Sequence, residues 1–206
     1  MDVNPVDVVA GARALVRREA EAVHALAAQL DDSFMTVVER VRATRGKVVT
    51  LGAGTSGLVA ERLAHLLSVC GTPAFYLPVL DALHGGVGAV TGDDVVIAFS
   101  KGGRSEELTA LVALLVERGI DVVAVTEAPT SPFALAATTV VSLRTDPADA
   151  DLGGLVATGS TLVASAWGDG LTAVLMELRG HTLRDVVAAH PAGVVGLAQV
   201  REGTSA

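Results

Sequence analysis

The sequence predicts an α/β protein built on a five-stranded, doubly wound parallel sheet. From Lys47 onward, short apolar runs rich in β-branched residues alternate with segments of helical periodicity, which is the pattern of repeated strand–helix–strand units. Most of these runs contain no polar alternation, as expected of strands that are covered on both faces. Half of the 206 residues are hydrophobic and only 3% are aromatic, a composition typical of close helix–sheet packing.

The segment before the first strand is expected to be helical. From Pro5 to about Arg42, apolar residues recur at three- and four-residue steps among charged ones. The sequence Asp31-Asp32-Ser33 can divide this helix into a hairpin, with Ser33 as the N-cap of its second half. We assign residues 1–45 to an N-terminal helical arm that packs on a neighbouring subunit, 46–200 to the α/β domain and 201–206 to a disordered tail.

The remaining elements follow in alternation. Strands are expected at Lys47–Leu51, Ala74–Leu77, Asp94–Phe99, Asp121–Thr126 and Thr139–Leu143. Helices are expected at Ser56–Cys70, Ser105–Arg118, near Pro132–Ala136, from about Ser160 to Arg179, and at Leu183–Ala189. An acidic loop, Asp146–Leu152, precedes the longest of these helices.

The first strand runs into a glycine turn, Gly52-Ala53-Gly54-Thr55-Ser56-Gly57. Three glycines at this spacing let consecutive N–H groups at a helix start face an anion, typically a phosphate. A dinucleotide site would also need an acid at the end of the second strand, whereas the nearest acid, Asp81, lies beyond that strand. The hydroxyls of Thr55 and Ser56 add donors that suit a terminal phosphate, so we favour a small phosphorylated ligand over a dinucleotide-dependent oxidoreductase.

The third strand ends in a second glycine- and hydroxyl-rich turn, Ser100-Lys101-Gly102-Gly103-Arg104-Ser105-Glu106-Glu107. Both turns follow parallel strands at their carboxyl ends, where open α/β sheets bind ligands. Ser105 can also be an ordinary N-cap with two glutamates in the first turn. The two interpretations are compatible, because a cap aims the helix amides at a ligand.

Charge and composition exclude several classes of function. A net charge of −8 argues against nucleic-acid partners and anionic membranes. The single cysteine, Cys70, excludes a disulfide framework and a cysteine zinc cluster within one chain. We find no signal peptide and no apolar run long enough to span a bilayer, and therefore expect a cytoplasmic protein.

Five motifs occur in order along the chain: Gly52–Gly57, Asp81–Gly88, Ser100–Glu107, Thr158–Thr161 leading to Gly168-Asp169, and His190–Gly196. Together they resemble the motifs of the sugar isomerase (SIS) domain family, and most closely those of its arabinose 5-phosphate isomerase branch. The resemblance extends from about Lys47 to Gly196. It implies a flavodoxin-like, three-layer αβα sandwich and a homodimer or homotetramer with shared active sites. It also implies no metal or organic cofactor. The regulatory pair of CBS domains that is often attached to that branch is expected to be absent, because the sequence stops soon after Gly196.

The resemblance also implies site residues. Glu107 and His190 match catalytic residues of the branch, and His84 matches a histidine that could bind a substrate hydroxyl or assist ring opening. Ser56, Ser100, Ser105, Ser160 and Thr161 fall on phosphate- and sugar-binding positions, and the two turns add Gly54, Thr55, Gly103 and Arg104.

Several positions depart from the branch. Thr55 stands where the branch has lysine, Gly102 where it has serine, and Arg104 where it has glutamate. A catalytic glutamate of the branch aligns with Ala148, so that Asp149 or Asp151 has to substitute for it. Without the turn lysine, the positive charge near the enediolate has to come from Arg104 or Lys101. We interpret Lys101, however, as a solvated loop residue.

These observations predict a phosphosugar isomerase that interconverts an aldose phosphate and a ketose phosphate through an enediol(ate), with Glu107 and His190 as base and acid. The alternative is a non-catalytic SIS protein that senses a sugar phosphate, in which loss of the turn lysine would be tolerated. The motifs do not distinguish pentose, hexose and heptose phosphates.

Overall fold

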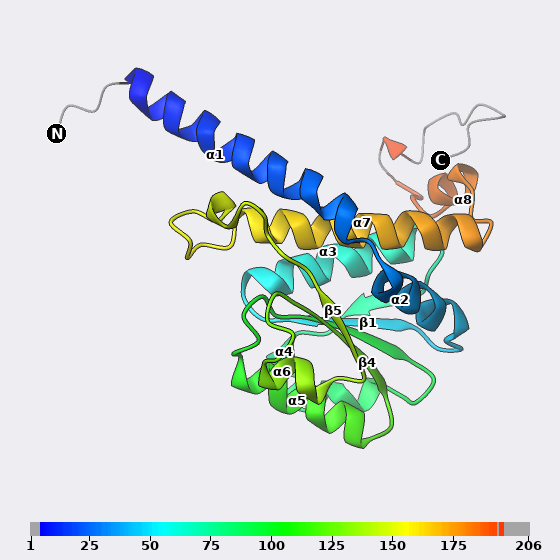
Figure 1. The fold of residues 1–206 in the computed structure, drawn as a ribbon. Helices are drawn as coiled ribbons and strands as arrows, with labels where there is room; N and C mark the ends of the chain where they lie inside the picture. Colours follow the sequence, from blue (N-terminus) through cyan, green and yellow to red (C-terminus); the bar gives the residue numbers. More distant parts are fainter. Residues whose placement is uncertain (1–4, 193, 196–206) are drawn as a thin grey trace.

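A five-stranded parallel sheet forms the centre of the molecule (Figure 1). In the computed structural model, which describes residues 5–192 and 194–195, the strands are β1 (Val48–Gly52), β2 (Ala74–Tyr76), β3 (Val95–Phe99), β4 (Asp121–Thr126) and β5 (Thr139–Ser142). Their order is β2-β1-β3-β4-β5, with every neighbouring pair parallel. The predicted fold class is confirmed, and the chain reverses its direction of winding between β1 and β3. The predicted tail, 201–206, lies outside the described residues.

Helices cover both faces of the sheet (Figure 1). One face packs against α2 (Asp32–Ala43), α3 (Thr55–Val69), α7 (Gly159–Leu178) and the end of α1 (Pro5–Leu26). The other packs against α4 (Val79–Leu83), α5 (Glu106–Glu117) and α6 (Pro132–Ala136). Successive strand residues alternate between the two cores, since Val95 and Ile97 join the first and Val96 and Ala98 the second. The result is the expected three-layer sandwich.

Short elements complete the chain. The described part of the chain also contains the 3-10 turns η1 (Ala27–Gln29), η2 (Gly86–Ala89) and η3 (Ala148–Ala150), and α8 (Leu183–Ala188) follows α7. Helix α4 was not expected, because five residues after a proline are too few to show helical periodicity. Among the described residues, no helix is both long and apolar enough to cross a bilayer.

The N-terminal helices differ from the expectation in two respects. The N-cap of α2 is Asp31, whose carboxylate accepts a hydrogen bond from the Ser33 N–H at 2.8 Å, so Ser33 as the cap was wrong. Asp31 takes this role because its backbone is extended immediately before the first helical residue. Phe34 and Val37 of α2 are buried in the sheet core, so the boundary at residue 45 does not separate two cores. The first half of α1 extends away from the sheet (Figure 1).

Candidate functional site

The two glycine turns begin side by side at the carboxyl edge of the sheet. Gly52, the last residue of β1, pairs in register with Phe99, the last residue of β3. The chain leaves β1 for the turn into α3 and leaves β3 for the loop into α5. The strand register therefore places the two predicted anion-binding turns next to each other at the reversal point of the sheet.

The first turn requires glycine for steric reasons. A Cβ on Gly52 would lie 2.5 Å from the carbonyl oxygen of Ser56, and a Cβ on Gly57 would lie 2.8 Å from the Tyr76 hydroxyl. Gly54 has a φ of 58° and is the N-cap of α3, where no side chain caps the helix. The first N–H groups of α3 are thus left without a side-chain partner, as an anion-binding turn requires.

Hydrogen bonds fasten the second loop to β4. The Ser100 N–H donates to the Val125 carbonyl, and the carbonyl of Lys101 accepts from the Thr126 hydroxyl and the Glu127 N–H, all at 3.0–3.1 Å. Ser105 is the N-cap of α5, because its Oγ accepts from the Leu108 N–H at 3.4 Å. The loop is therefore held rigidly by its own strand and by the neighbouring one.

A pocket at this edge gathers five hydroxyl side chains. We call it the hydroxyl pocket; its polar lining residues are Ser56, Ser100, Lys101, Thr126, Glu127, Ser160 and Thr161, and its apolar ones are Val59, Phe99, Val125, Leu143, Ala157 and Ala164. Four of the predicted ligand-binding residues, Ser56, Ser100, Ser160 and Thr161, are thus brought together from α3, the β3 loop and the start of α7. Hydroxyls and a cation on an apolar floor suit the phosphate or the hydroxyl groups of a sugar.

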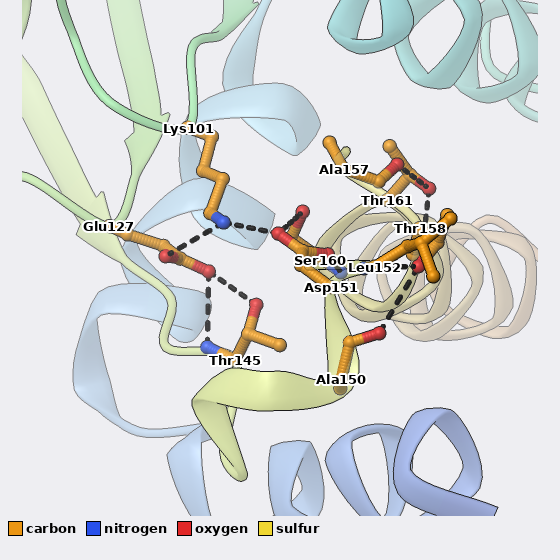
Figure 2. A network of polar contacts seen from close by, with 10 residues as sticks. All are labelled: Lys101, Glu127, Thr145, Ala150, Asp151, Leu152, Ala157, Thr158, Ser160 and Thr161. Carbon is orange, nitrogen blue, oxygen red and sulfur yellow. Dashed lines mark hydrogen bonds and ion pairs between the residues drawn. The ribbon is translucent and has the colours of Figure 1, made fainter. Parts of the chain in front are cut away.

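Beside this pocket lies an ionic network centred on Lys101 (Figure 2). The Lys101 ammonium donates to Asp151 Oδ2, and its Nζ lies 3.9 Å from Glu127 Oε2. Asp151 also accepts from the Ser160 N–H at 2.8 Å and the Ser160 hydroxyl at 2.9 Å, and Glu127 accepts from the N–H and hydroxyl of Thr145. Lys101 is therefore not the solvated loop cation that we expected from the sequence.

The Asp151 carboxylate is almost completely buried, with 1% of its side chain exposed. Burial alone would raise its pKa, but the hydrogen bond from Lys101, those from Ser160 and the lysine charge outweigh burial and lower the pKa below its usual range. The group therefore stays ionised, which makes it a weak base near neutral pH.

A second hollow lies on the other side of the glycine turns. We call it the Glu107 groove; it is lined by Gly52, Ala53, Gly54, Tyr76, Pro78, Val79, Leu80, Leu83, Ser105 and Glu107. Glu107 is exposed in the first turn of α5, where its Oε2 lies 3.4 Å from the Ser105 hydroxyl. The structure thus divides the predicted site residues between two adjacent hollows.

Other predicted residues lie outside both hollows. Arg104 is exposed in the loop, and Gly103, with a φ of 60°, packs against Ser131. Thr55 lines a neighbouring depression that shares Thr161 with the hydroxyl pocket. His84 caps the C-terminus of α4 and is exposed, one residue after the groove residue Leu83.

Asp149 and His190 are directed elsewhere. Asp149 is exposed and forms an ion pair with Arg18 of α1 at 3.4 Å. His190 follows α8, and its Nδ1 lies 2.7 Å from the Val186 carbonyl oxygen. Helix α7 separates the hydroxyl pocket from this region, since its 20 residues span about 30 Å.

Thr126 and Glu127 also line the hydroxyl pocket and were not predicted from the sequence. Both follow the buried strand β4 at the same edge as the two glycine turns. The rule that selected those turns would have selected these residues as well, because every parallel strand of a sheet ends at that edge. Among the described residues, no three His, Cys, Asp or Glu side chains form a group that could hold a metal ion.

Comparison with known proteins gives a consistent family signal. The SIS domain model matches residues 43–167. Arabinose 5-phosphate isomerase KdsD of Pseudomonas aeruginosa is 36% identical over 191 residues, which are 93% of this chain and 58% of the relative. The enzyme of the same name from Escherichia coli K12 is 34% identical over 178 residues, or 86% of this chain and 54% of the relative. The chain therefore spans little more than half the length of these curated relatives.

A solved structure matches over its full length. A protein of Escherichia coli CFT073, solved in complex with A5P, is 30% identical and superimposes with a TM-score of 0.86. The match covers 92% of this chain and 100% of that one. The similarity thus includes the helices around the sheet as well as the strands.

Proposed function

Because the chain belongs to the SIS domain family, we propose that it is a phosphosugar isomerase that interconverts an aldose phosphate and a ketose phosphate. One observation above all supports this proposal: the exposed Glu107 carboxylate and the Gly52–Gly54 turn line one groove, while Ser56 and Ser100, which belong to the same two glycine turns, line the hydroxyl pocket. The two turns thus carry both the proposed base and the proposed phosphate donors.

The isomerisation needs a base next to the sugar carbonyl. Glu107 removes the proton from C2 of the aldose while an acid protonates O1, which gives an enediol. The proton on O2 then leaves and a proton returns to C1, which gives the ketose. The first N–H groups of α3 and the hydroxyls of the pocket hold the phosphate of the substrate, which positions the carbonyl end of the sugar for Glu107.

The names of the relatives suggest the first substrate to test. Two curated relatives are arabinose 5-phosphate isomerases, and the solved neighbour is a complex with A5P. We propose arabinose 5-phosphate as the first candidate, with hexose and heptose phosphates as alternatives. The ligand would place its phosphate between the turns Gly54–Gly57 and Ser100–Ser105.

We further propose that the enzyme is a cytoplasmic homo-oligomer with shared active sites, without nucleic-acid or membrane partners. His190 lies beyond the far end of α7 from the hydroxyl pocket, which supports its acting in a neighbouring subunit. A symmetric dimer makes this exchange reciprocal, so each subunit lends one imidazole to the other.

The test is an NMR assay of the sugar phosphate panel in D₂O. Proton abstraction predicts deuterium from the solvent at C2 of the aldose, together with the ketose product. Glu107→Gln should lower turnover by orders of magnitude because the variant lacks the base. Glu106→Gln is the matched control, since it removes the same charge from the same helix turn at a residue that lines neither hollow.

The outcomes of this assay separate enzyme from sensor. A protein that binds a sugar phosphate without exchanging deuterium or forming ketose would be a sensor, and the isomerase proposal would be wrong. Full turnover in Glu107→Gln would assign the base to another residue, with His84 the next candidate.

A further inference from the structure

The chain contains two lysines, and both pair with a buried aspartate. Lys47 pairs with Asp94 before β1 and β3 begin, and Lys101 pairs with Asp151 after β3 ends. The exposed fractions match closely: 35% for Lys47, 36% for Lys101 and 1% for each aspartate. The pairs therefore lie at opposite edges of the same sheet, with similar burial, and can be compared directly.

The Lys47 pair has a clear structural task. Its ammonium donates to both oxygens of Asp94, at 3.1 and 2.9 Å, and the Lys47 N–H donates to the same carboxylate at 2.9 Å. Asp94 also accepts from the N–H and hydroxyl of Thr91. The carboxylate thus joins the segment before β1 to the turn before β3, and the lysine is part of that joint.

The Lys101–Asp151 pair contributes little to joining segments of the chain. The loop after β3 is already fastened to β4 by backbone bonds from Ser100 and Glu127, and Asp151 is already fixed to α7 by the two bonds from Ser160. A lysine–carboxylate pair is by itself weak evidence of stability, because the cost of desolvation offsets the attraction. The fold therefore does not explain the presence of Lys101.

The Lys101 ammonium has N–H groups that are available to donate to a ligand. It carries three N–H groups, of which Asp151 accepts one; Glu127, at 3.9 Å, is close enough for an ion pair and too far for a hydrogen bond. Lys101 lines the hydroxyl pocket, and among the described residues that line it, it is the only cation. The nearby Arg62 is committed, since two of its nitrogens bind Asp169 at 2.5 and 3.1 Å.

We propose that Lys101 is the ligand-binding cation of this site and donates its free N–H groups to the phosphate of the bound sugar phosphate, while Asp151 and Glu127 hold the ammonium in place. This inference rests on the proposed function for the class of its ligand and goes beyond it in naming the cation. Fixed in advance by two carboxylates, the ammonium loses little freedom when the ligand arrives. The ammonium also offsets part of the repulsion that the two carboxylates would otherwise exert on a phosphate dianion.

NMR of protein labelled with ¹³C at lysine tests the proposal directly. The two lysines give two sets of Cε–Hε signals, and the variants Lys47→Arg and Lys101→Arg assign them, because each variant removes one set. Titration with inorganic phosphate at constant ionic strength should shift the Lys101 signal and leave that of Lys47 in place. By calorimetry, Lys101→Met should weaken binding of phosphate and of arabinose 5-phosphate by about tenfold or more, the scale of a lost charged hydrogen bond. Unphosphorylated arabinose should be unaffected.

Two further variants keep the test decisive. Lys47→Met is the matched control and should lower the unfolding temperature without changing affinity below that temperature. Lys101→Met leaves the buried Asp151 carboxylate without its cation and could therefore unfold the protein. In that case the double variant Lys101→Met with Asp151→Asn replaces it, because it removes the lysine and the unpaired carboxylate charge together.

The possible results separate this inference from the isomerase proposal. Phosphate binding with an unmoved Lys101 signal, or with full affinity in the variants that replace Lys101, overturns the inference and leaves the isomerase proposal standing. Binding through Lys101 without turnover of any sugar phosphate supports the inference and overturns the isomerase. If the wild-type protein binds neither inorganic phosphate nor a sugar phosphate, both are wrong.

Discussion

At the scale of single residues, Ser105 has two roles at the start of α5. Its Oγ accepts the Leu108 N–H as the helix cap and lies 3.4 Å from a Glu107 carboxylate oxygen in the groove. The sequence predicted both the cap and the site, because serine before two glutamates is a local signal. Local signals of this kind selected Gly54, Ser56, Ser100, Ser105 and Glu107 among the residues that line the two hollows, and the family resemblance added Ser160 and Thr161.

We predict that Ser105→Ala weakens sugar phosphate binding by about 1–3 kcal/mol, as expected when a charged acceptor loses one hydrogen bond. Ser131→Ala is the control, since Ser131 caps α6 in the same way, with its Oγ accepting the Ala134 N–H at 3.3 Å, and lines neither hollow. Both variants should lose about 1 kcal/mol of folding stability, and calorimetry should find weaker binding in Ser105→Ala alone. Unchanged affinity in that variant would remove Ser105 from the site.

At the scale of elements, the turn between β1 and α3 depends on close backbone approach. We predict that Gly52→Ala destabilises the fold by about 1–3 kcal/mol, the usual cost of overpacking, because the new Cβ would lie 2.5 Å from a backbone oxygen. Gly11→Ala, with nothing within 4 Å of its Cβ in the exposed part of α1, should instead stabilise by up to about 1 kcal/mol. Urea unfolding measures the free energy of unfolding of both variants, which should fall in Gly52→Ala and rise in Gly11→Ala. A similar change in both would contradict the steric explanation.

The segments before β1 and β3 are joined by Asp94, which makes the fold sensitive to acid. Burial alone would raise the pKa of Asp94, but hydrogen bonds from Thr91 and Lys47 lower it below its ordinary value of 3.8. The folded state therefore releases this proton more readily than the unfolded chain does. The stability that the charge contributes is complete above pH 3.8 and is lost as the pH falls through the lower folded pKa.

We predict that Asp94→Asn lowers the free energy of unfolding at pH 7 by about 3 kcal/mol, the scale of breaking a buried pair, and weakens its pH dependence below 3.8. Asp93→Asn is the control, since Asp93 is 54% exposed and pairs with Arg45, which is 84% exposed; such surface pairs contribute about 0–1 kcal/mol. Chemical denaturation across this pH range makes the comparison. An Asp94→Asn profile parallel to wild type would assign the acid sensitivity to other carboxylates.

At the scale of the whole molecule, His190 and Glu107 lie in different regions of one chain. The end of α7 lies beside the end of α3, where the His181 Nε2 is 3.2 Å from the Val69 carbonyl. Both helices begin at the carboxyl edge of the sheet, so the chain after α7 starts from the opposite end of the molecule. This separation is the basis of our proposal that His190 acts in the site of a second subunit.

We predict that Glu107→Ala and His190→Ala are each inactive and that mixed dimers of the two regain part of the activity, because one of their sites contains both groups. Co-expression with two affinity tags isolates the mixed species for assay. A mixture of Glu107→Ala and Glu107→Gln is the control, since it has no intact site. An inactive mixed species, with exchange verified by mass spectrometry, would place His190 in its own subunit's site or outside catalysis.

The strands, most of the helices and the two glycine turns could be predicted from the sequence, because they depend on periodicity and on turn chemistry within a few residues. Parallel strands end at one edge, so the sequence also predicted that the two glycine turns lie next to each other there. Helix α4 was missed because it is too short to show a period, and the Asp31 cap was missed because only backbone geometry distinguishes it from its neighbours.

The tertiary structure alone decided how the charges of the site are arranged. Lys101 and Asp151 are 50 residues apart, and no local pattern shows that they meet. The packing of α7 against α3, with Trp167 on Phe99 of β3, places Asp151 beside Lys101, whereas Asp149 pairs with Arg18 of the arm helix α1. Two aspartates that are equivalent in the sequence therefore differ completely in burial and partner, because side-chain pairing across elements depends on register and packing rather than on neighbouring residues.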